Sequence, residues 1–341
     1  MKPLLSLLTA ALGLLLLLSA TPAHAEKTAE ELISPRTQAA IDKGLRYLAN
    51  RQIKRGPDAG AYGGGSFPGA PGIVGLTGLA FMCDGSTPGI GRYGAEVKRC
   101  TEFVERNTAE TGYIARKGDE AGNMYSHGFA TLFLSQAYGM TQDDKAKAKL
   151  KASVDMLIAA QNDQGGWRYQ PRKTDADLSV TVCQIMALRG ARDAGIHVPE
   201  KTRDKCIEYV KRSSNQNGSF SYTLGFGGGG SFPLTGAGLV SLYSAGIYDD
   251  PIINTGLKFL QNNRNPRRAN YYFYGHYYAV QAFWHAGGDP WEKWYNDIRV
   301  ELLEKQDASG AWNSKYGTEF ATAMALIILQ MPKDVVPVFA R

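Results

Sequence analysis

Two strings of one pattern decide the fold of this 341-residue chain: Gln161-Asn-Asp-Gln-Gly165-Gly166-Trp167 and Gln306-Asp-Ala-Ser-Gly310-Ala311-Trp312. Both have the form Q-x-x-x-G-x-W, and both separate an amphipathic segment from an apolar one rich in small residues. Matched strings so far apart indicate an internal repeat whose unit is a pair of helices joined by a Gly-aromatic turn.

The amphipathic segments recur six times, and their aliphatic anchors are 42 to 56 residues apart, at Leu48, Val104, Ile158, Val210, Leu260 and Leu302. Apolar residues are spaced by three and four within them, with Lys, Arg and Glu between. This pattern predicts helices with one packed face and one solvated face.

Each amphipathic helix is followed by an almost uncharged segment, and these lie at 73–83, 126–138, 178–191, 234–245, 276–286 and 319–330. A helix that is apolar all round must be buried all round. The sequence therefore predicts an all-α fold of six helical hairpins, in which six buried helices are ringed by six amphipathic ones, as a single domain over 26–341.

Residues 1–25 combine one lysine, a Leu-rich run and a small-residue stop at Ala23-His24-Ala25, which is typical of a cleaved secretory signal. We expect a secreted or periplasmic protein that begins near Glu26, because no later stretch is long and apolar enough to span a membrane.

The formal net charge is +6, and it becomes +5 without Lys2. This mild charge gives little support to nucleic-acid binding, and the basic run 145–151 is expected to be a solvated helix face.

Four cysteines in an exported chain allow disulfides. Cys100 and Cys206 hold equivalent positions in two helices, so they are not expected to pair with each other. Cys183 is the better placed partner for Cys206, and Cys83 with Cys100 is the alternative.

If the inner helices run parallel, their N-termini meet at one mouth of the ring and favour an anion there. The polar candidates at this level are Tyr62, His127, Asp175, Asp177, His276 and Glu319. Aromatic residues gather at the same level, among them Trp167, Tyr274 and Tyr277. These residues form the predicted ligand pocket and catalytic set.

The Q-x-x-x-G-x-W turns, the Gly-Gly-Ser-Phe loops and the final helix Ala321-Thr-Ala-Met-Ala-Leu-Ile-Ile-Leu-Gln330 resemble the prenyltransferase and squalene-cyclase repeat superfamily. The resemblance covers nearly all of the chain after the leader and implies an α/α toroid. It does not fix an activity, because one fold hosts many functions.

Asp175-Ala-Asp177-Leu-Ser resembles the D-x-D-D motif of squalene-type cyclases, in which the middle carboxylic acid protonates an alkene. Leu178 replaces the last carboxylate of that motif. Cyclases of this type also commonly combine two α-barrel domains, whereas this chain has one.

Prenyltransferase β subunits hold zinc through Asp, Cys and His, and the resemblance assigns these positions to Asp177, Ser179 and His276. Ser179 stands where the thiolate is needed, so no cofactor is expected and zinc is only an alternative. Plain structural interpretations also stand: Asp177 as a helix N-cap, His127 and His276 as hydrogen-bonded core residues, and the tyrosines as core.

The sequence supports two hypotheses. In the first, an exported toroid with degenerate catalytic motifs binds an apolar or amphipathic ligand, or a protein partner, in its central cavity. In the second, an enzyme acts on an isoprenoid or a glycan, using Asp177 with His276 and His127; a glycan hydrolase would need two of Asp175, Asp177 and Glu319 close together.

Overall fold

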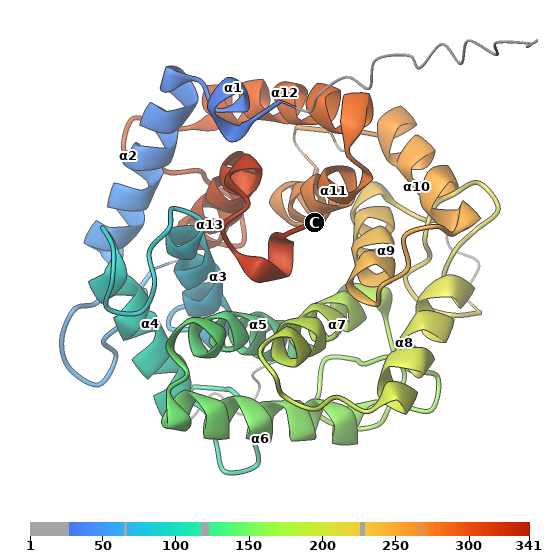
Figure 1. Cartoon of the computed structure of the whole chain (residues 1–341), viewed down its shortest axis with the longest axis horizontal. Coiled ribbons are helices and arrows are strands. Elements are labelled where there is room, and N and C mark those ends of the chain that lie inside the picture. Colours follow the sequence, from blue (N-terminus) through green and yellow to red (C-terminus); the bar gives the residue numbers. More distant parts are fainter. Residues whose placement is uncertain (1–26, 65–66, 117–122, 226–228, 265, 268) are drawn as a thin grey trace, which may run out of the picture.

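The computed structural model describes residues 27–64, 67–116, 123–225, 229–264, 266–267 and 269–341, so the predicted signal segment 1–25 lies outside the described residues. The described helices form two concentric rings (Figure 1). The inner ring contains α3 (Pro71–Met82), α5 (Met124–Thr141), α7 (Leu178–Asp193), α9 (Phe232–Ser244), α11 (Tyr272–Ala286) and α13 (Thr318–Gln330). The outer ring contains α2 (Pro35–Arg51), α4 (Gly94–Arg106), α6 (Asp144–Ala160), α8 (Glu200–Arg212), α10 (Pro251–Asn262) and α12 (Gly288–Lys305), and a short α1 (Ala29–Leu32) precedes α2.

The inner ring closes on itself. Each inner helix packs against the next one along the chain, and α13 returns to pack against α3. The inner helices are buried over nearly their whole length, as their uniform apolar character requires. The predicted α/α toroid is confirmed.

The pairing of inner and outer helices differs from the sequence prediction, which joined each outer helix to the inner helix that comes after it. In the structure α4 packs on α3, α6 on α5, α10 on α9 and α12 on α11, and α2 packs mainly on α13; only α8, among the described outer helices, contacts the following inner helix, α9, more than the preceding one. The physical reason is loop length: residues 142–143 alone link α5 to α6, whereas residues 161–177 separate α6 from α7. Short links favour antiparallel neighbours.

Glutamines at the ends of outer helices bind each turn to the next outer helix. The Gln161 side chain donates from Nε2 to the carbonyl of Gly165 at 3.0 Å and to that of Thr202 on α8 at 3.0 Å. Gln306 repeats this arrangement at 2.9 and 2.8 Å, with the carbonyls of Gly310 and Ala40. Because Ala40 lies on α2, the last bond joins the two ends of the outer ring.

The tryptophans of the two strings fasten the turns from inside. Trp167 donates from Nε1 to the carbonyl of Leu157 at 2.9 Å, and its backbone N–H donates to the Thr181 hydroxyl at 3.0 Å. Trp312 makes the same two bonds at 2.7 and 3.0 Å, to Leu302 and Thr322. Both indoles are buried, so their part in the fold is to lock an outer helix to the following inner helix.

All four cysteines are free thiols, so the expected pairing of Cys183 with Cys206 is wrong, as is the alternative of Cys83 with Cys100. Cys206 accepts a hydrogen bond from Gln161 at 3.3 Å, whereas Cys183 lies 3.2 Å from the Tyr278 hydroxyl inside the barrel. The Cys183 thiol on α7 therefore faces the inside of the barrel, whereas the Cys206 thiol on α8 faces Gln161 of the third turn. Cys100 does occupy the position equivalent to Cys206, since it accepts from Gln52 at 3.2 Å.

The C-terminal segment covers the end of the barrel where the inner helices finish. Helix α13 is followed by the 3-10 turns η1 (Met331–Lys333) and η2 (Pro337–Phe339), and the chain ends inside the ring in Figure 1. The Val338 N–H donates to Gln136 Oε1 at 3.2 Å, and Lys333 pairs with Asp84 at 2.7 Å. This segment therefore contacts several inner helices and closes one mouth.

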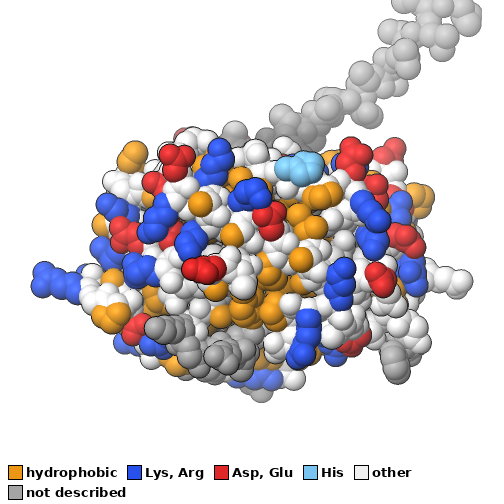
Figure 2. All heavy atoms as spheres, turned by 90° about the horizontal axis from the view of Figure 1, so that it is seen from below, with side chains coloured by type: hydrophobic (Ala, Val, Ile, Leu, Met, Phe, Trp, Pro, Cys, Tyr) orange, Lys and Arg blue, Asp and Glu red, His pale blue; other side chains and the backbone are white. Residues whose placement is uncertain are grey.

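On the side of the ring seen in Figure 2, acidic and basic side chains are interspersed around hydrophobic ones near the centre of the view. Lys145, Lys147 and Lys151 are exposed on α6, which confirms the prediction of a solvated basic face. Within the described ranges, no helix has the length and apolar character that a membrane crossing requires.

Candidate functional site

Asp177 is fully buried at the N-terminus of α7, where the inner helices begin. Its Oδ1 accepts hydrogen bonds from the Ser179 hydroxyl at 2.6 Å and from the Val180 N–H at 2.8 Å. Its Oδ2 accepts from the Tyr222 hydroxyl at 3.3 Å and lies 3.4 Å from Arg168 Nε. Burial raises the pKa of Asp177 above its ordinary value, although all of these donors lower it.

Arg168 connects the two aspartates of the D-x-D string to two tyrosines. Its Nη1 lies 2.7 Å from the mostly exposed Asp175 carboxylate. The guanidinium also lies 4.9 Å from the ring centroid of Tyr169 and 5.5 Å from that of Tyr222, within cation–π range. The hydroxyls of these two tyrosines are hydrogen-bonded to each other.

A row of tyrosines continues from this cluster across the mouth. The Tyr125 ring centroid lies 6.1 Å from that of Tyr169 and 6.4 Å from that of Tyr274 on α11. The Tyr125 hydroxyl lies 2.5 Å from Ser179 Oγ, and Tyr274 donates to the Ser179 carbonyl at 2.7 Å. Ser179, expected as a degenerate metal ligand, is instead the residue that ties these tyrosines to Asp177.

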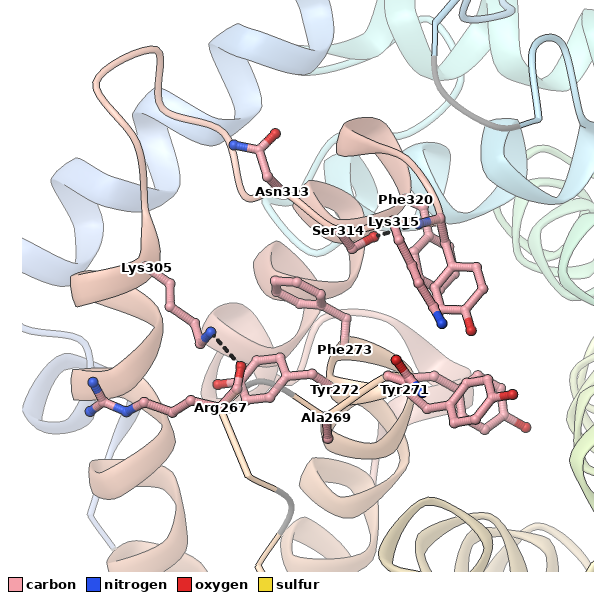
Figure 3. A pocket seen from close by; sticks show the side chains of 13 residues that line it. Arg267, Ala269, Tyr271, Tyr272, Phe273, Lys305, Asn313, Ser314, Lys315 and Phe320 are labelled. Carbon is pink, nitrogen blue, oxygen red and sulfur yellow. Dashed lines mark hydrogen bonds between the residues drawn. The ribbon is translucent and has the colours of Figure 1, made fainter.

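Tyr274 also lines a pocket of about 220 Å³ at the same mouth (Figure 3). The pocket lies where α11 and α13 begin, and α12 ends beside it. Its lining combines aromatic rings with cationic and amide side chains, including Tyr271, Tyr316, Phe320, Arg267, Lys305 and Lys315. Tyr271, which is 57 % exposed, stacks on Tyr316 with 5.8 Å between ring centroids.

Aromatic side chains from opposite inner helices meet inside the barrel, where the sequence predicted a central cavity for the ligand. Helices α5 and α11 face each other across the inner ring (Figure 1), yet the Phe129 and Tyr277 rings on them are 5.9 Å apart. From the closed end, Phe339 of η2 reaches within 6.2 Å of the Tyr277 ring. Tyr277, a predicted pocket residue, is therefore fully buried core.

His127 points away from the mouth cluster although it lies two residues after Tyr125. Two residues on an α-helix differ by about 200° in direction. His127 Nδ1 accepts the Ile114 N–H at 3.1 Å, and its ring stacks on Tyr113 at 5.5 Å. Burial lowers the pKa of His127 to about 3, so the imidazole is neutral at physiological pH.

His276 is fully buried on the side of α11 that faces the outer ring. Its ring lies 4.6 Å from Tyr272, 5.0 Å from Phe232 on α9 and 5.7 Å from Trp294 on α12. The structure therefore does not bring His276 to Asp177. Within the described ranges, no group of three or more His, Cys, Asp or Glu side chains could hold a metal ion.

The other predicted residues are dispersed. Trp167 belongs to the turn, and Tyr62 is buried near Thr77 and Cys100, where burial raises its phenolic pKa. Glu319 is buried at the start of α13, with its Oε1 3.5 Å from Arg51 Nε. Of the predicted set, Asp175, Asp177, Ser179 and Tyr274 contribute side chains to the cluster at the mouth.

Sequence reasoning missed Arg168, Tyr125, Tyr169 and Tyr222. A signal for two of them exists in the repeat: Gly165-Gly-Trp-Arg-Tyr169 and Gly218-Ser-Phe-Ser-Tyr222 place a tyrosine at the same position of consecutive turns. Adjacent units bring equivalent positions side by side, so the two hydroxyls meet.

No protein-family model matches the chain, and no curated protein matches it significantly. Solved structures do match. The type II terpene cyclase MstE from Scytonema superposes with a TM-score of 0.62 at 13 % identity, over 88 % of this chain and 99 % of that one. Its complex with the product merosterolic acid A gives 0.62 at 14 % identity, over 87 % and 97 %.

A second kind of enzyme shares the architecture. An inactive variant of the α-1,6-mannanase GH76A of Salegentibacter sp. HEL1_6, in complex with α-1,6-mannotriose, superposes with a TM-score of 0.62 at 8 % identity, over 87 % of this chain and 99 % of that one. Identities this low carry the fold and not the chemistry. The chain thus has the squalene-cyclase-like α/α toroid fold, which it shares with a terpene cyclase and a mannanase.

Proposed function

We propose that this protein is an exported, non-catalytic toroid that binds an amphipathic ligand at the open mouth rather than in the barrel. The observation that carries the proposal is the connection through Tyr274, which belongs both to the pocket and to the tyrosine row above Asp177. An apolar chain would lie along the row while a polar group occupies the pocket. The rings of Phe129 and Tyr277 meet inside the barrel, so side chains occupy the space along its axis there.

The environment of Asp177 supports a structural role for its carboxylate. The Asp177 carboxylate accepts hydrogen bonds from Ser179, Val180 and Tyr222 and forms an ion pair with Arg168. All four of these groups are donors. A proton on this carboxyl group would have to displace one of these donors. The hydrogen bond to Val180 also makes Asp177 the N-cap of α7.

The solved neighbours support the amphipathic class. One structure of the cyclase holds geranylgeranyl dihydroxybenzoate, which joins a long hydrocarbon chain to a polar ring. We transfer to this chain only the amphipathic character of that molecule, because the catalytic residues are not matched at this identity.

Isothermal titration calorimetry with dodecyl maltoside, kept below its micelle concentration, tests the proposal, with mannotriose as a ligand that lacks a hydrocarbon chain. We expect dodecyl maltoside to bind and Tyr271→Ala to weaken it roughly fivefold or more, as loss of an aromatic anchor does. Tyr248→Ala is the matched control, because Tyr248 is 54 % exposed in the loop between α9 and α10, at the opposite end. Binding of mannotriose alone would contradict the proposal.

A cyclase-like enzyme is the second candidate, favoured by one observation: burial raises the pKa of Asp177 beside the aromatic rings of Tyr125 and Tyr274. A carboxylic acid with a raised pKa can act as a proton donor. Incubation with geranylgeranyl dihydroxybenzoate, followed by chromatography, should then show a cyclised isomer that Asp177→Asn does not form. Absence of product with the wild type would remove this candidate.

We also propose that the protein needs no zinc, since His276 and Asp177 lie in different environments. Elemental analysis of the purified protein tests this, and stoichiometric zinc would contradict it.

A further inference from the structure

The pocket at the start of α11 and α13 has a one-sided charge. Arg267, Lys305 and Lys315 line it, and none of the described residues that line it is acidic. We propose that this pocket binds an anionic head group, a carboxylate or a phosphate monoester. The inference deepens the proposed function and rests on it: it names the chemical class of the polar end of the amphipathic ligand.

The cations lie on both sides of the pocket. Figure 3 shows Arg267 and Lys305 on one side and Lys315 on the other, with aromatic rings between them. Lys305 donates to the Arg267 carbonyl at 2.8 Å. A head group between the two sides would meet positive charge from two directions, which favours an anion over a neutral group.

Two of the cations are positioned by contacts that leave them charged. Lys305 Nζ lies 4.5 Å from the Tyr272 ring centroid, and Lys315 Nζ lies 5.2 Å from that of Tyr316. An ammonium group over a ring face keeps its N–H donors and its charge. Arg267 is held differently, because it pairs with Glu304 at 2.7 Å and with Glu301 at 3.6 Å. Lys305 and Lys315 lie on opposite sides of the pocket, so a head group between them would meet both charges.

The backbone adds to this charge. Helices α11 and α13 begin at the pocket without a side-chain cap, whereas Asn123 and Asp177 cap α5 and α7. Uncapped first-turn N–H groups carry a partial positive charge. This contribution is secondary to the lysines.

The opposite side of the mouth sets the direction of the ligand. Beside α7, two carboxylates, Asp175 and Asp177, face the single guanidinium of Arg168, so this cluster has a formal charge of about −1 and disfavours an anion. The head group therefore lies at α11 and α13, and the hydrocarbon chain extends past Tyr274 toward Tyr125.

Calorimetric titration of the mature chain with dodecyl phosphate, dodecanoate and dodecyl maltoside, all below their micelle concentrations, tests the inference. The first two ligands distinguish phosphate from carboxylate, and the third has the same chain with a neutral head. We expect the double variant Lys305→Gln/Lys315→Gln to bind at least one anionic ligand about tenfold more weakly, while its affinity for dodecyl maltoside is unchanged. Added salt should reduce the difference.

The matched control is Lys98→Gln/Lys147→Gln, which removes two exposed lysines from α4 and α6 on the lateral wall. Equal losses in the two double variants, or equal wild-type affinity for charged and neutral ligands, would overturn the inference while leaving the proposed function intact. If no amphiphile binds at all, the proposed function fails and the inference fails with it.

Discussion

The third and sixth Gly-aromatic turns are constructed alike and differ in the segment after each tryptophan. In both, a glutamine binds the next outer helix and a tryptophan binds the preceding one. After Trp167, residues 168–177 precede α7 and supply Arg168, Tyr169 and Asp177. After Trp312, only residues 313–317 precede α13, and they form one wall of the basic pocket. The shared part holds the ring together, and the variable part determines what the mouth presents.

This difference indicates how a repeat toroid can change its ligand without changing its fold. The indole hydrogen bonds of Trp167 and Trp312 lie between buried side chains and buried backbone carbonyls. The segment after each tryptophan can therefore vary in length and charge without disturbing them. The same turn is thus followed by a segment that contributes carboxylates to the mouth at α7 and by one that contributes a lysine at α13.

The largest expected effect is on the shared part. Trp167→Ala and Trp312→Ala should each lower the free energy of unfolding by about 3–5 kcal/mol, because each empties a buried site and removes the hydrogen bond to an outer helix. Urea denaturation followed by circular dichroism measures both. Clearly unequal losses would show that the two turns are not energetically equivalent.

The sequence predicted the recurring Gly-aromatic turn and the toroid because both depend on residues that recur. Gln161 and Gln306, with their tryptophans, appear at fixed spacing, and uncharged inner helices leave no alternative to burial. The N-cap role of Asp177 was also predictable from its position before an apolar helix.

The site was less predictable because it depends on side-chain direction and volume. His127 and Tyr125 are neighbours in sequence, but one contacts the loop residue Ile114 and the other contacts Ser179. The contact between Phe129 and Tyr277 across the barrel axis could be predicted only from the diameter of the inner ring, and no local sequence pattern determines that diameter. Cys183 and Cys206 were judged by depth along the helices, and their opposite facing was not visible in the sequence.

The glycines of the two turns provide a sharper comparison. Gly165 has φ +97° and Gly310 has φ +92°, a region that L side chains rarely adopt. A Cβ on Gly165 would lie 2.1 Å from the Lys205 carbonyl oxygen, whereas one on Gly310 would lie 2.8 Å from the Lys43 Cβ.

We expect Gly165→Ala to cost about 2–3 kcal/mol and Gly310→Ala somewhat less, as measured by urea denaturation. A larger loss of stability for Gly310→Ala than for Gly165→Ala would mean that α2 shifts to accommodate the new Cβ less readily than α8 does. Gly225→Ala is a suitable control for φ alone, because its φ is +80° and no atom that the structure describes, apart from its chain neighbours, lies within 4 Å of its Cβ position.

The residues directly after the two tryptophans should respond differently. Arg168→Ala removes the ion pair to the buried Asp177 and should cost about 1.5 kcal/mol. Asn313→Ala removes a bond to Asp307 at the surface and should cost about 0.5 kcal/mol. Because Arg168 lowers the pKa of Asp177, its loss should raise that pKa further, which carboxyl carbon NMR can follow. An unchanged Asp177 titration would contradict the coupling.

The smallest expected effect is on the pH dependence of stability, which should have opposite signs for the carboxylates of Asp177 and Asp307. Burial raises the pKa of Asp177, whereas hydrogen bonds from Ser309 and Asn313 lower the pKa of Asp307 in the sixth turn. A raised pKa means that ionisation opposes folding, so the stabilising effect of the protonated form is lost as the pH rises through the folded pKa of Asp177. Relative to Asp177→Asn, the wild type should thus lose stability as the pH rises through the folded pKa of Asp177, by up to about 1 kcal/mol.

For Asp307 the sign reverses: its ionised form stabilises the fold, and the contribution is lost as the pH falls through its lowered pKa. Asp307→Asn should therefore be less stable at neutral pH, by roughly 0.5 kcal/mol given its exposure, and equal to the wild type in acid. Asparagine already stands at the equivalent position of the third turn, where Asn162 accepts the Gly166 N–H at 3.0 Å, so the substitution preserves the turn. Unfolding free energies of both variants across the acid range measure the two slopes. Slopes of the same sign would mean that burial does not govern the pKa of Asp177, and the distinction between a buried carboxylate and an exposed turn carboxylate would be lost.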